Sequence, residues 1–226
     1  MPMLRCPRLA IVVTAVTLVA CIPLKVSEQH VVATTRSEPV AADWDPTIGP
    51  DVHMAFAHRF KTVMREQSDR VEIVDPDDVW KAAGVGEPGT EAKLSEVLSV
   101  RSGGLFDDLG IRYLIVLGPE TKPVRKQVIE AAAFYSKWTV ETSREAVLVG
   151  IAGPMRGRLR YIAAASGEEH EGWVPGTPLI FARLYSTSDT EESALKALAR
   201  QVVDRILSAS TESPVRVALF AGKVGP

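Results

Sequence analysis

The stretch LFDDLGIRYLIVLG, residues 105–118, decides the fold. Its apolar run over residues 113–117 has no polar break, which is typical of a strand buried on both faces of a sheet. Gly110 ends a short helical turn before this run, and Gly118 with Pro119 stops the strand after it. We therefore expect residues 113–117 to be the central strand of the fold.

The residues upstream of this strand alternate between helical and strand patterns. Asp51 is a suitable N-cap for a helix whose apolar side chains recur at helical spacing: Val52, Phe56, Phe60, Val63 and Met64. Residues 71–74 predict a short β-branched strand that ends before Pro76, and Asp77 is placed to cap the helix that follows. A third helix is expected over residues 91–100.

Downstream of the central strand, further strands are expected in succession. Three of them are predicted from apolar and β-branched runs between polar or glycine-rich turns: residues 134–141, 146–151 and 158–165. Residues 178–185 predict another strand, and residues 215–220 a last one. The clearest amphipathic helix in the chain covers residues 191–207, with Thr190 as its expected cap.

These elements together predict a single α/β (α+β) domain in three layers, a mixed sheet between helices. The globular domain is expected over residues 51–226. Residues 21–50 are rich in Ser, Thr, Glu and Pro without a sustained period, so we expect a tether there. Alternatively, residues 31–33 add a short edge strand. Trp44 is expected to dock onto the surface of the domain.

The N-terminus has the composition of a secretion signal. Arg5 and Arg8 precede residues 9–20, which carry no charge and are mostly apolar. This run has about 12 residues, whereas a helix that crosses a membrane needs about 20. Residues 1–20 are therefore expected to be a signal peptide that is removed.

The signal ends in Leu18-Val19-Ala20-Cys21, which resembles the lipobox of bacterial lipoproteins. The resemblance implies cleavage between Ala20 and Cys21 and a lipid anchor, including palmitate, on Cys21. Acyl chains that bury about 0.8 kcal/mol per methylene would hold the protein on a membrane. Ile22 follows the cysteine where the family uses Asp for inner-membrane retention. An outer-membrane lipoprotein facing the periplasm is therefore expected, with the inner membrane or the cell surface as alternatives.

Composition narrows the classes of partner. The chain has 26 basic and 28 acidic residues, and the expected loss of Arg5 and Arg8 leaves 24 basic residues against 28 acidic ones. This mildly acidic balance argues against a nucleic-acid partner. Cys6 is lost with the signal as well, so Cys21 is the only cysteine left and no disulfide framework is expected.

Three short motifs match functional patterns, but their context opposes each function. Residues 84–89 fit G-x-G-x-x-G, yet they follow a helix, whereas a nucleotide site needs a strand there. Residues 75–78 lack the alternating oxygen ligands of a calcium loop. Residues 193–196 match S-x-x-K, but the companion motifs S-D-N and K-T-G are missing. No catalytic residue, metal, nucleotide or other cofactor is expected.

His170 is the one titratable group whose surroundings suggest chemistry. It lies among Glu168, Glu169 and Glu171 in a polar stretch, residues 166–176, expected to be a loop. A histidine among carboxylates can bind a metal or transfer protons. Because no second histidine is near in sequence, a solvated loop tip is the simpler interpretation.

The order of elements over residues 51–207 resembles a domain found in envelope proteins, and Leu109 to Gly118 carries most of the resemblance. This domain is shared by curli-secretion lipoproteins, outer-membrane activators of peptidoglycan synthases and the N-terminal domain of the Tol translocation protein. The resemblance implies a domain that binds partner proteins and performs no chemistry.

The expected function is therefore a lipid-anchored envelope protein whose periplasmic domain binds partner proteins in envelope assembly or maintenance. The alternative is a hydrolase or transferase acting on the cell wall, or a glycan-binding lipoprotein. A pocket that brings His170 and the acids near Ser136 or Tyr135 would favour the enzyme. A shallow apolar surface without convergent titratable groups would favour the binding domain.

Overall fold

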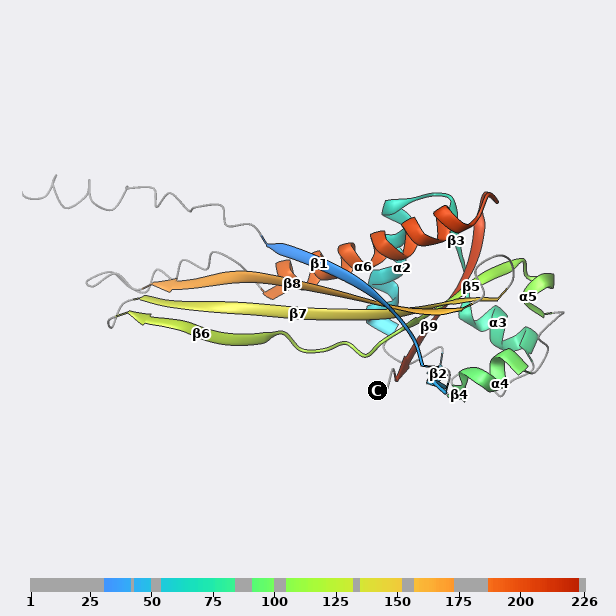
Figure 1. Cartoon of the computed structure of the whole chain (residues 1–226), viewed down its shortest axis with the longest axis horizontal. Coiled ribbons are helices and arrows are strands. Elements are labelled where there is room, and N and C mark those ends of the chain that lie inside the picture. Colours follow the sequence, from blue (N-terminus) through green and yellow to red (C-terminus); the bar gives the residue numbers. More distant parts are fainter. Residues whose placement is uncertain are drawn as a thin grey trace, which may run out of the picture.

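The computed structural model describes residues 31–41, 43–49, 54–83, 91–99, 105–131, 135–151, 157–172 and 187–223. The strands are β1 (Val32–Pro39), β2 (Thr47–Gly49), β3 (Val71–Val74), β4 (Ala92–Lys93), β5 (Ile111–Leu117), β6 (Val124–Ala131), β7 (Tyr135–Gly150), β8 (Arg158–Gly172) and β9 (Val215–Lys223). The described helices are α2 (Met54–Gln67), α3 (Pro76–Ala83), α4 (Leu94–Ser99), α5 (Leu105–Asp108) and α6 (Thr187–Ala209). The expected mixed α/β fold is confirmed (Figure 1).

All nine strands among the described residues belong to one sheet, whose main path runs β1-β8-β7-β5-β9-β2-β4. Strand β3 pairs with β9, and β6 pairs with β7. The predicted central strand is confirmed as β5, which pairs antiparallel with β7 and parallel with β9. Gly110, with a φ of 67°, makes the turn from α5 into β5.

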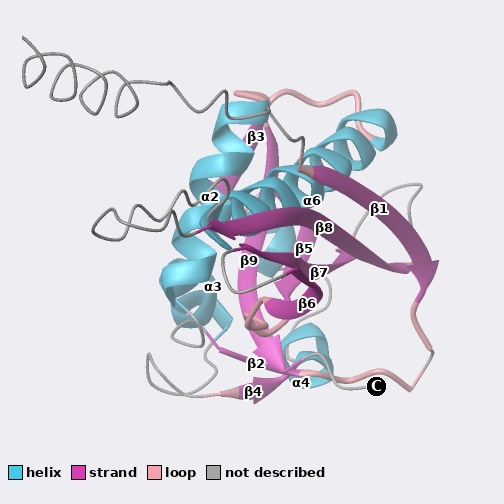
Figure 2. Ribbon diagram, turned by 90° about the vertical axis from the view of Figure 1, so that its left-hand side faces the viewer, coloured by secondary structure: helices cyan, strands magenta, loops and turns pink. Residues whose placement is uncertain are grey.

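Side chains of β5 alternate between two hydrophobic clusters, which is why its apolar run has no break. Tyr113, Ile115 and Leu117 belong to the first cluster, which α2 and α6 cover. Leu114 and Val116 belong to the second cluster, which α3, α4 and α5 cover. The sheet is therefore the middle of three layers, and Figure 2 shows α2 and α6 on one side of it.

Both long helices cover the sheet with the faces that the sequence indicates. In α2, Phe56, Phe60 and Met64 are almost fully buried. In α6, a buried stripe repeats at helical spacing along the predicted range 191–207: Leu195, Leu198, Ala199, Val202, Val203 and Ile206. Thr190 is not the cap of this helix, because α6 begins at Thr187 and Thr190 is buried inside its first turn.

Helix α3 is capped by Asp75. The prediction that Asp77 caps this helix is wrong. The Asp77 backbone N–H donates to Asp75 Oδ1 over 3.0 Å, and the N–H groups of Asp78 and Val79 donate to the Asp75 carbonyl. Pro76 takes the first helical position, where a missing N–H costs nothing. The predicted strand before this cap is confirmed as β3.

The tether expected over residues 21–50 is wrong for its described part. Strand β1 pairs with β8 along its full length, and β2 pairs with β9 and β4. Trp44 lies in the second hydrophobic cluster at 9% exposure, so it is a core residue rather than a surface contact. The alternative of an edge strand over residues 31–33 is correct in kind, but β1 extends to Pro39. Its mostly polar residues on both faces hide its length in the sequence pattern.

Two strands are longer than the sequence indicated. The runs 134–141 and 146–151 are joined in the single strand β7, because the polar residues between them alternate in and out of the sheet. Strand β8 continues to Gly172, so the loop expected from residue 166 is wrong up to that point. Strand β6 was not predicted from the sequence.

Strands β6, β7 and β8 project beyond the rest of the sheet, toward the left of Figure 1. The register pairs Val32 with Ser166 and Tyr135 with Gly172. At about 3.3 Å per residue, β8 therefore continues about 20 Å past the start of β1. Helix α6 contacts β1, β7 and β8 on one side of the sheet.

Several predicted features lie outside the described residues. They are the signal peptide over residues 1–20, the cleavage site at Ala20, the lipidation site at Cys21, the glycine motif over 84–89 and the strand over 178–185. None of the described helices combines the length and the apolarity that a membrane crossing requires.

Candidate functional site: a groove on the open face of the sheet

One face of the sheet is uncovered where β1, β8, β7 and the start of β6 lie side by side. Thr142, Arg144 and Ala146 of β7 are buried, so the residues between them lie on the opposite side. We call this surface the open face. It consists of Val32, Thr34, Arg36, Glu38, Val124, Glu141, Ser143, Glu145, Arg160, Ile162, Ala164 and Ser166, all exposed or half-buried.

A groove of about 530 Å³ crosses the open face from β1 to residues 121–124. Small side chains line it between these ends, including Thr34, Ser143, Ala164 and Ser166. Val32 is 58% exposed and Val124 is 51% exposed, and both line the groove. No other large hydrophobic side chain among the described residues is exposed to this degree. The two most exposed large hydrophobic residues of the described surface therefore lie at opposite ends of one groove.

The far wall of the groove is the segment between β5 and β6, and buried Arg144 holds it. Arg144 Nη1 donates to the Thr121 carbonyl over 2.8 Å and to Thr121 Oγ1 over 3.2 Å. The Thr121 hydroxyl in turn donates to the Ser143 carbonyl over 2.7 Å. These bonds fix the wall to β7, directly beside the floor of the groove.

Arg144 is an unusual core residue because burial opposes its charge. Its side chain is 1% exposed, and its Cζ lies 5.6 Å from the centre of the Phe56 ring. Burial lowers the pKa of the Arg144 guanidinium, and the nearby carboxylates of Glu120 and Glu191 offset part of this effect. Arg144 Nε and Nη2 are buried without a hydrogen bond, which is a rare and costly arrangement.

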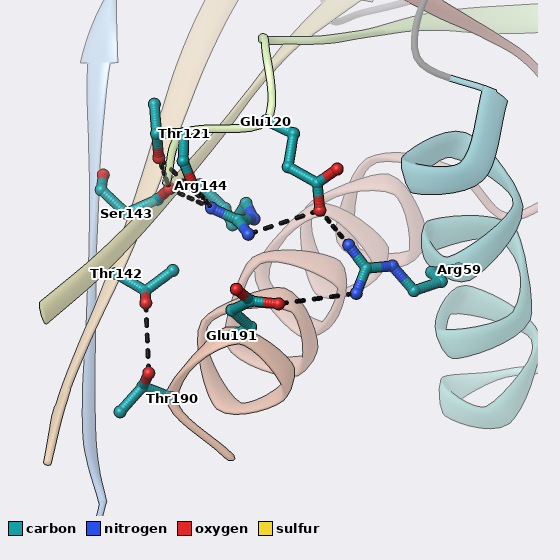
Figure 3. Close-up of polar contacts among 8 residues, drawn as sticks. All are labelled: Arg59, Glu120, Thr121, Thr142, Ser143, Arg144, Thr190 and Glu191. Atoms are coloured by element: carbon teal, nitrogen blue, oxygen red, sulfur yellow. Dashed lines mark hydrogen bonds and ion pairs between the residues drawn. The ribbon is translucent and has the colours of Figure 1, made fainter. Parts of the chain in front are cut away.

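Ion pairs extend from Arg144 to both long helices, as Figure 3 shows. Glu120 lies 3.5 Å from Arg144 Nη2 and also pairs with Arg59 of α2. Arg59 lies 3.7 Å from Glu191 of α6. Beside this network, the hydroxyls of Thr142 and Thr190 share a buried hydrogen bond of 3.1 Å. The wall of the groove is thus connected to α2 and α6 through the sheet.

Some charged side chains around the groove have an ion-pair partner, and others have none among the described residues. Glu141 pairs with Lys126 at 3.8 Å, and Arg160 pairs with both Glu38 and Glu145. By contrast, Lys122 and Arg36 are exposed cations without an ion pair or hydrogen bond among the described residues. Lys122 lines the groove, and Arg36 lies on the open face two residues beyond Thr34. The unmatched charge at the groove is positive.

A second cavity, of about 430 Å³, lies between α2 and α6. Its lining includes cations and anions that already pair, such as Lys196 with Glu192 and Arg59 with Glu191. His58 is exposed at its rim. With its charges matched internally, this cavity offers no distinct preference for a ligand, and the groove is the better candidate site.

The residues considered for an enzyme lie along the projecting strands. The register pairs His170 with Lys137, Ser136 with Glu171 and Tyr135 with Gly172. Directly paired residues share a face and successive residues alternate, so the position of Ser136 belongs to the face opposite His170, whereas the position of Tyr135 belongs to the same face as His170. Among the described residues, no group of His, Cys, Asp or Glu side chains has the arrangement of a metal site.

Comparison of the chain with family models and with curated proteins, and of its structure with solved structures, gives no match. The function therefore has to be argued from the residues themselves.

Proposed function

We propose that the protein is a lipid-anchored envelope protein whose domain binds a partner protein through the groove on the open face. Cys21 carries the lipid, and the domain acts in assembly or maintenance of the envelope without performing chemistry. The lipobox Leu18 to Cys21 and the resemblance of residues 51–207 to partner-binding envelope domains support this proposal.

The observation that carries the binding half is that Val32 and Val124, the two most exposed large hydrophobic residues of the described surface, line opposite ends of one groove. Single exposed apolar residues are normal on a protein surface, but two that line the same groove can both contact one bound segment. The floor between the two valines has small side chains, so an incoming apolar group can approach the strands closely. A network that holds buried Arg144 keeps the far wall in place before any ligand arrives.

The anchor places this groove near a membrane. Ten residues, 22–31, separate Cys21 from Val32, which lines the groove. Even a fully extended chain covers at most about 3.6 Å per residue, so Val32 would lie within about 40 Å of the lipid. The partner is therefore expected to be a protein that is present close to the membrane surface.

Recovery of the partner from intact cells tests the proposal. The full-length, lipidated protein is crosslinked in its native envelope and purified as wild type, as Ala164→Glu and as Arg200→Glu. Ala164 is exposed on the floor of the groove, so a glutamate there blocks the groove without entering the core. Arg200 is exposed on α6, on the other side of the sheet, and serves as the control.

We expect the same partner with wild type and with Arg200→Glu, and its loss with Ala164→Glu. Equal recovery with all three proteins would show that the groove is not the binding site.

A further inference from the structure

We infer that the groove recognises an extended acidic segment of its partner, with one aliphatic side chain between two carboxylates. This inference rests on the proposed function and adds the chemistry of the ligand. It follows from the apolar ends of the groove, from its unmatched charges and from its length.

The apolar part of the ligand is set by Val32 and Val124. Both are more than half exposed, so contact with an apolar group of the ligand would remove apolar surface from water. The floor consists of small side chains at Thr34, Ser143 and Ala164, so a branched aliphatic group can approach the strands closely. One Val, Ile or Leu side chain of the ligand is therefore expected to lie on this floor.

The charge of the ligand is inferred from Arg36 and Lys122. The carboxylates of the open face at Glu38, Glu141 and Glu145 are all taken by Lys126 or Arg160. Neither Arg36 nor Lys122 has such a partner among the described residues. Complementary charges steer association and reject ligands of the same sign, so the segment is expected to be acidic.

The spacing of the two acids follows from the sheet. Arg36 is on β1, whereas Lys122 is beyond β7, next to the start of β6. Strands β1 and β6 are three strand spacings apart, with β8 and β7 between them. At about 4.8 Å for each spacing, the distance is about 14 Å. An extended segment covers that distance in about four residues, which places acids at positions i and i+4 with the aliphatic residue between them.

Two labelled heptapeptides provide the probes. The first, Gly-Glu-Ser-Val-Ser-Glu-Gly, has the inferred pattern, and the second has Lys in place of both Glu residues. Binding of each to the full-length protein is measured by fluorescence anisotropy at low and at high salt. The proteins are wild type, Arg36→Glu/Lys122→Glu and the control Arg65→Glu, which changes an exposed cation on α2.

We expect wild type and Arg65→Glu to bind the Glu peptide more tightly than the Lys peptide, by up to about 25-fold, since each of the two exposed charge pairs contributes up to about fivefold. The double variant is expected to invert this preference. High salt is expected to reduce both preferences, because these charges are exposed.

Equal binding of the two peptides, no binding of either, or a preference that survives in the double variant would overturn the inference. So would a dimer that Ala164→Glu dissociates in sedimentation, because a second copy of the chain would then occupy the groove. If Ala164→Glu removes the partner from cells while the Glu peptide fails to bind, the proposed function stands and the acidic ligand is wrong.

Discussion

Arg144 is a single buried residue that supports the proposed binding surface without lining it. Its guanidinium holds Thr121 from inside the sheet, and Thr121 lines the groove on the outside. Yet two of its nitrogen atoms have no hydrogen bond, and Glu120, its ion partner, is 36% exposed at the surface. The network therefore costs free energy at Arg144 that an apolar side chain would not cost.

The free-energy cost of burying the Arg144 guanidinium predicts different effects for two substitutions. We expect Arg144→Met to change the free energy of unfolding by at most about 1 kcal/mol, because an apolar replacement removes a buried charge and Glu120 keeps Arg59 as a partner. We expect Glu120→Gln to cost more, about 2 kcal/mol, because it leaves a charged guanidinium buried without its ion pair. Urea unfolding at pH 7 measures both.

Arg59→Gln is the control, since an exposed pair contributes about 0–1 kcal/mol. A greater loss of stability in Arg144→Met than in Glu120→Gln would mean that the hydrogen bonds to Thr121, and not the ion pair, dominate the network.

Arg144 was not identified from the sequence, and the reason is physical. The stretch Glu141-Thr142-Ser143-Arg144-Glu145 is polar at every position, so it has the composition of a turn. Only alternation in a long strand buries Thr142 and Arg144 while their neighbours stay outside. Sequence composition carries no signal for a buried arginine whose partners come from distant segments.

At the scale of single elements, Asp45 fastens the N-terminal strands to helix α4. Its Oδ1 accepts from the Ser95 backbone N–H and its Oδ2 from the Ser95 hydroxyl, each over 2.7 Å. Desolvation raises the pKa of Asp45, but the hydrogen bonds from Ser95 and the nearby Lys93 and Arg158 outweigh it, so the pKa is lowered. A distant carboxylate thus takes part in capping the helix.

A depressed folded-state pKa means that the ionised form is stabilised by folding. The contribution of Asp45 is therefore fully present above the unfolded pKa of about 3.9 and is lost as the pH falls through the folded pKa. We expect Asp45→Asn to lower stability by about 1 kcal/mol at pH 7. The difference from wild type should shrink below about pH 4. Thermal unfolding between pH 7 and pH 3 measures this, and a constant difference would contradict it.

The close approach of β2 to β9 gives a second prediction at this scale. A Cβ atom at Gly222 would lie 2.9 Å from the Thr47 carbonyl oxygen and 3.0 Å from Val116 Cγ1. Because the first contact is with backbone, the strain cannot be relieved by a rotamer change, and Gly222→Ala is expected to cost about 1–3 kcal/mol.

The exposed β1 substitution Ser37→Ala is the control, within about 0.5 kcal/mol of wild type. Chemical denaturation compares the two, and an unchanged midpoint for Gly222→Ala would mean that β2 can move away from β9.

Elements with strong apolar patterns could be predicted from the sequence. Strands that are stabilised mainly by pairing with other strands were largely missed. Strand β5 and helix α6 are apparent from their own periodicity, because each buries a continuous face or stripe. Strands β1 and β6 are edge strands with polar faces, so their stability comes from β8 and β7 rather than from their own composition. The groove lies between these strands, and it was therefore not foreseen.

At the scale of the whole molecule, the proposed anchor at Cys21 lies close in sequence to one strand of the groove. Strand β1 follows the proposed lipid by ten residues and provides one end of the groove. We expect Cys21→Ser to abolish acylation and to release the protein from the membrane fraction. Labelling with a palmitate analogue and fractionation measure this. Normal labelling and fractionation of Cys21→Ser would show that the protein is not a lipoprotein anchored at Cys21.

The location of the partner on the surface is the most direct test of the central claim. A photoreactive residue is placed at position 164 on the open face, or at position 200 on α6, in the full-length protein in its native envelope. We expect irradiation to join one partner protein to position 164 and none to position 200. The same partner joined to position 200 and absent from position 164 would contradict a binding site on the open face.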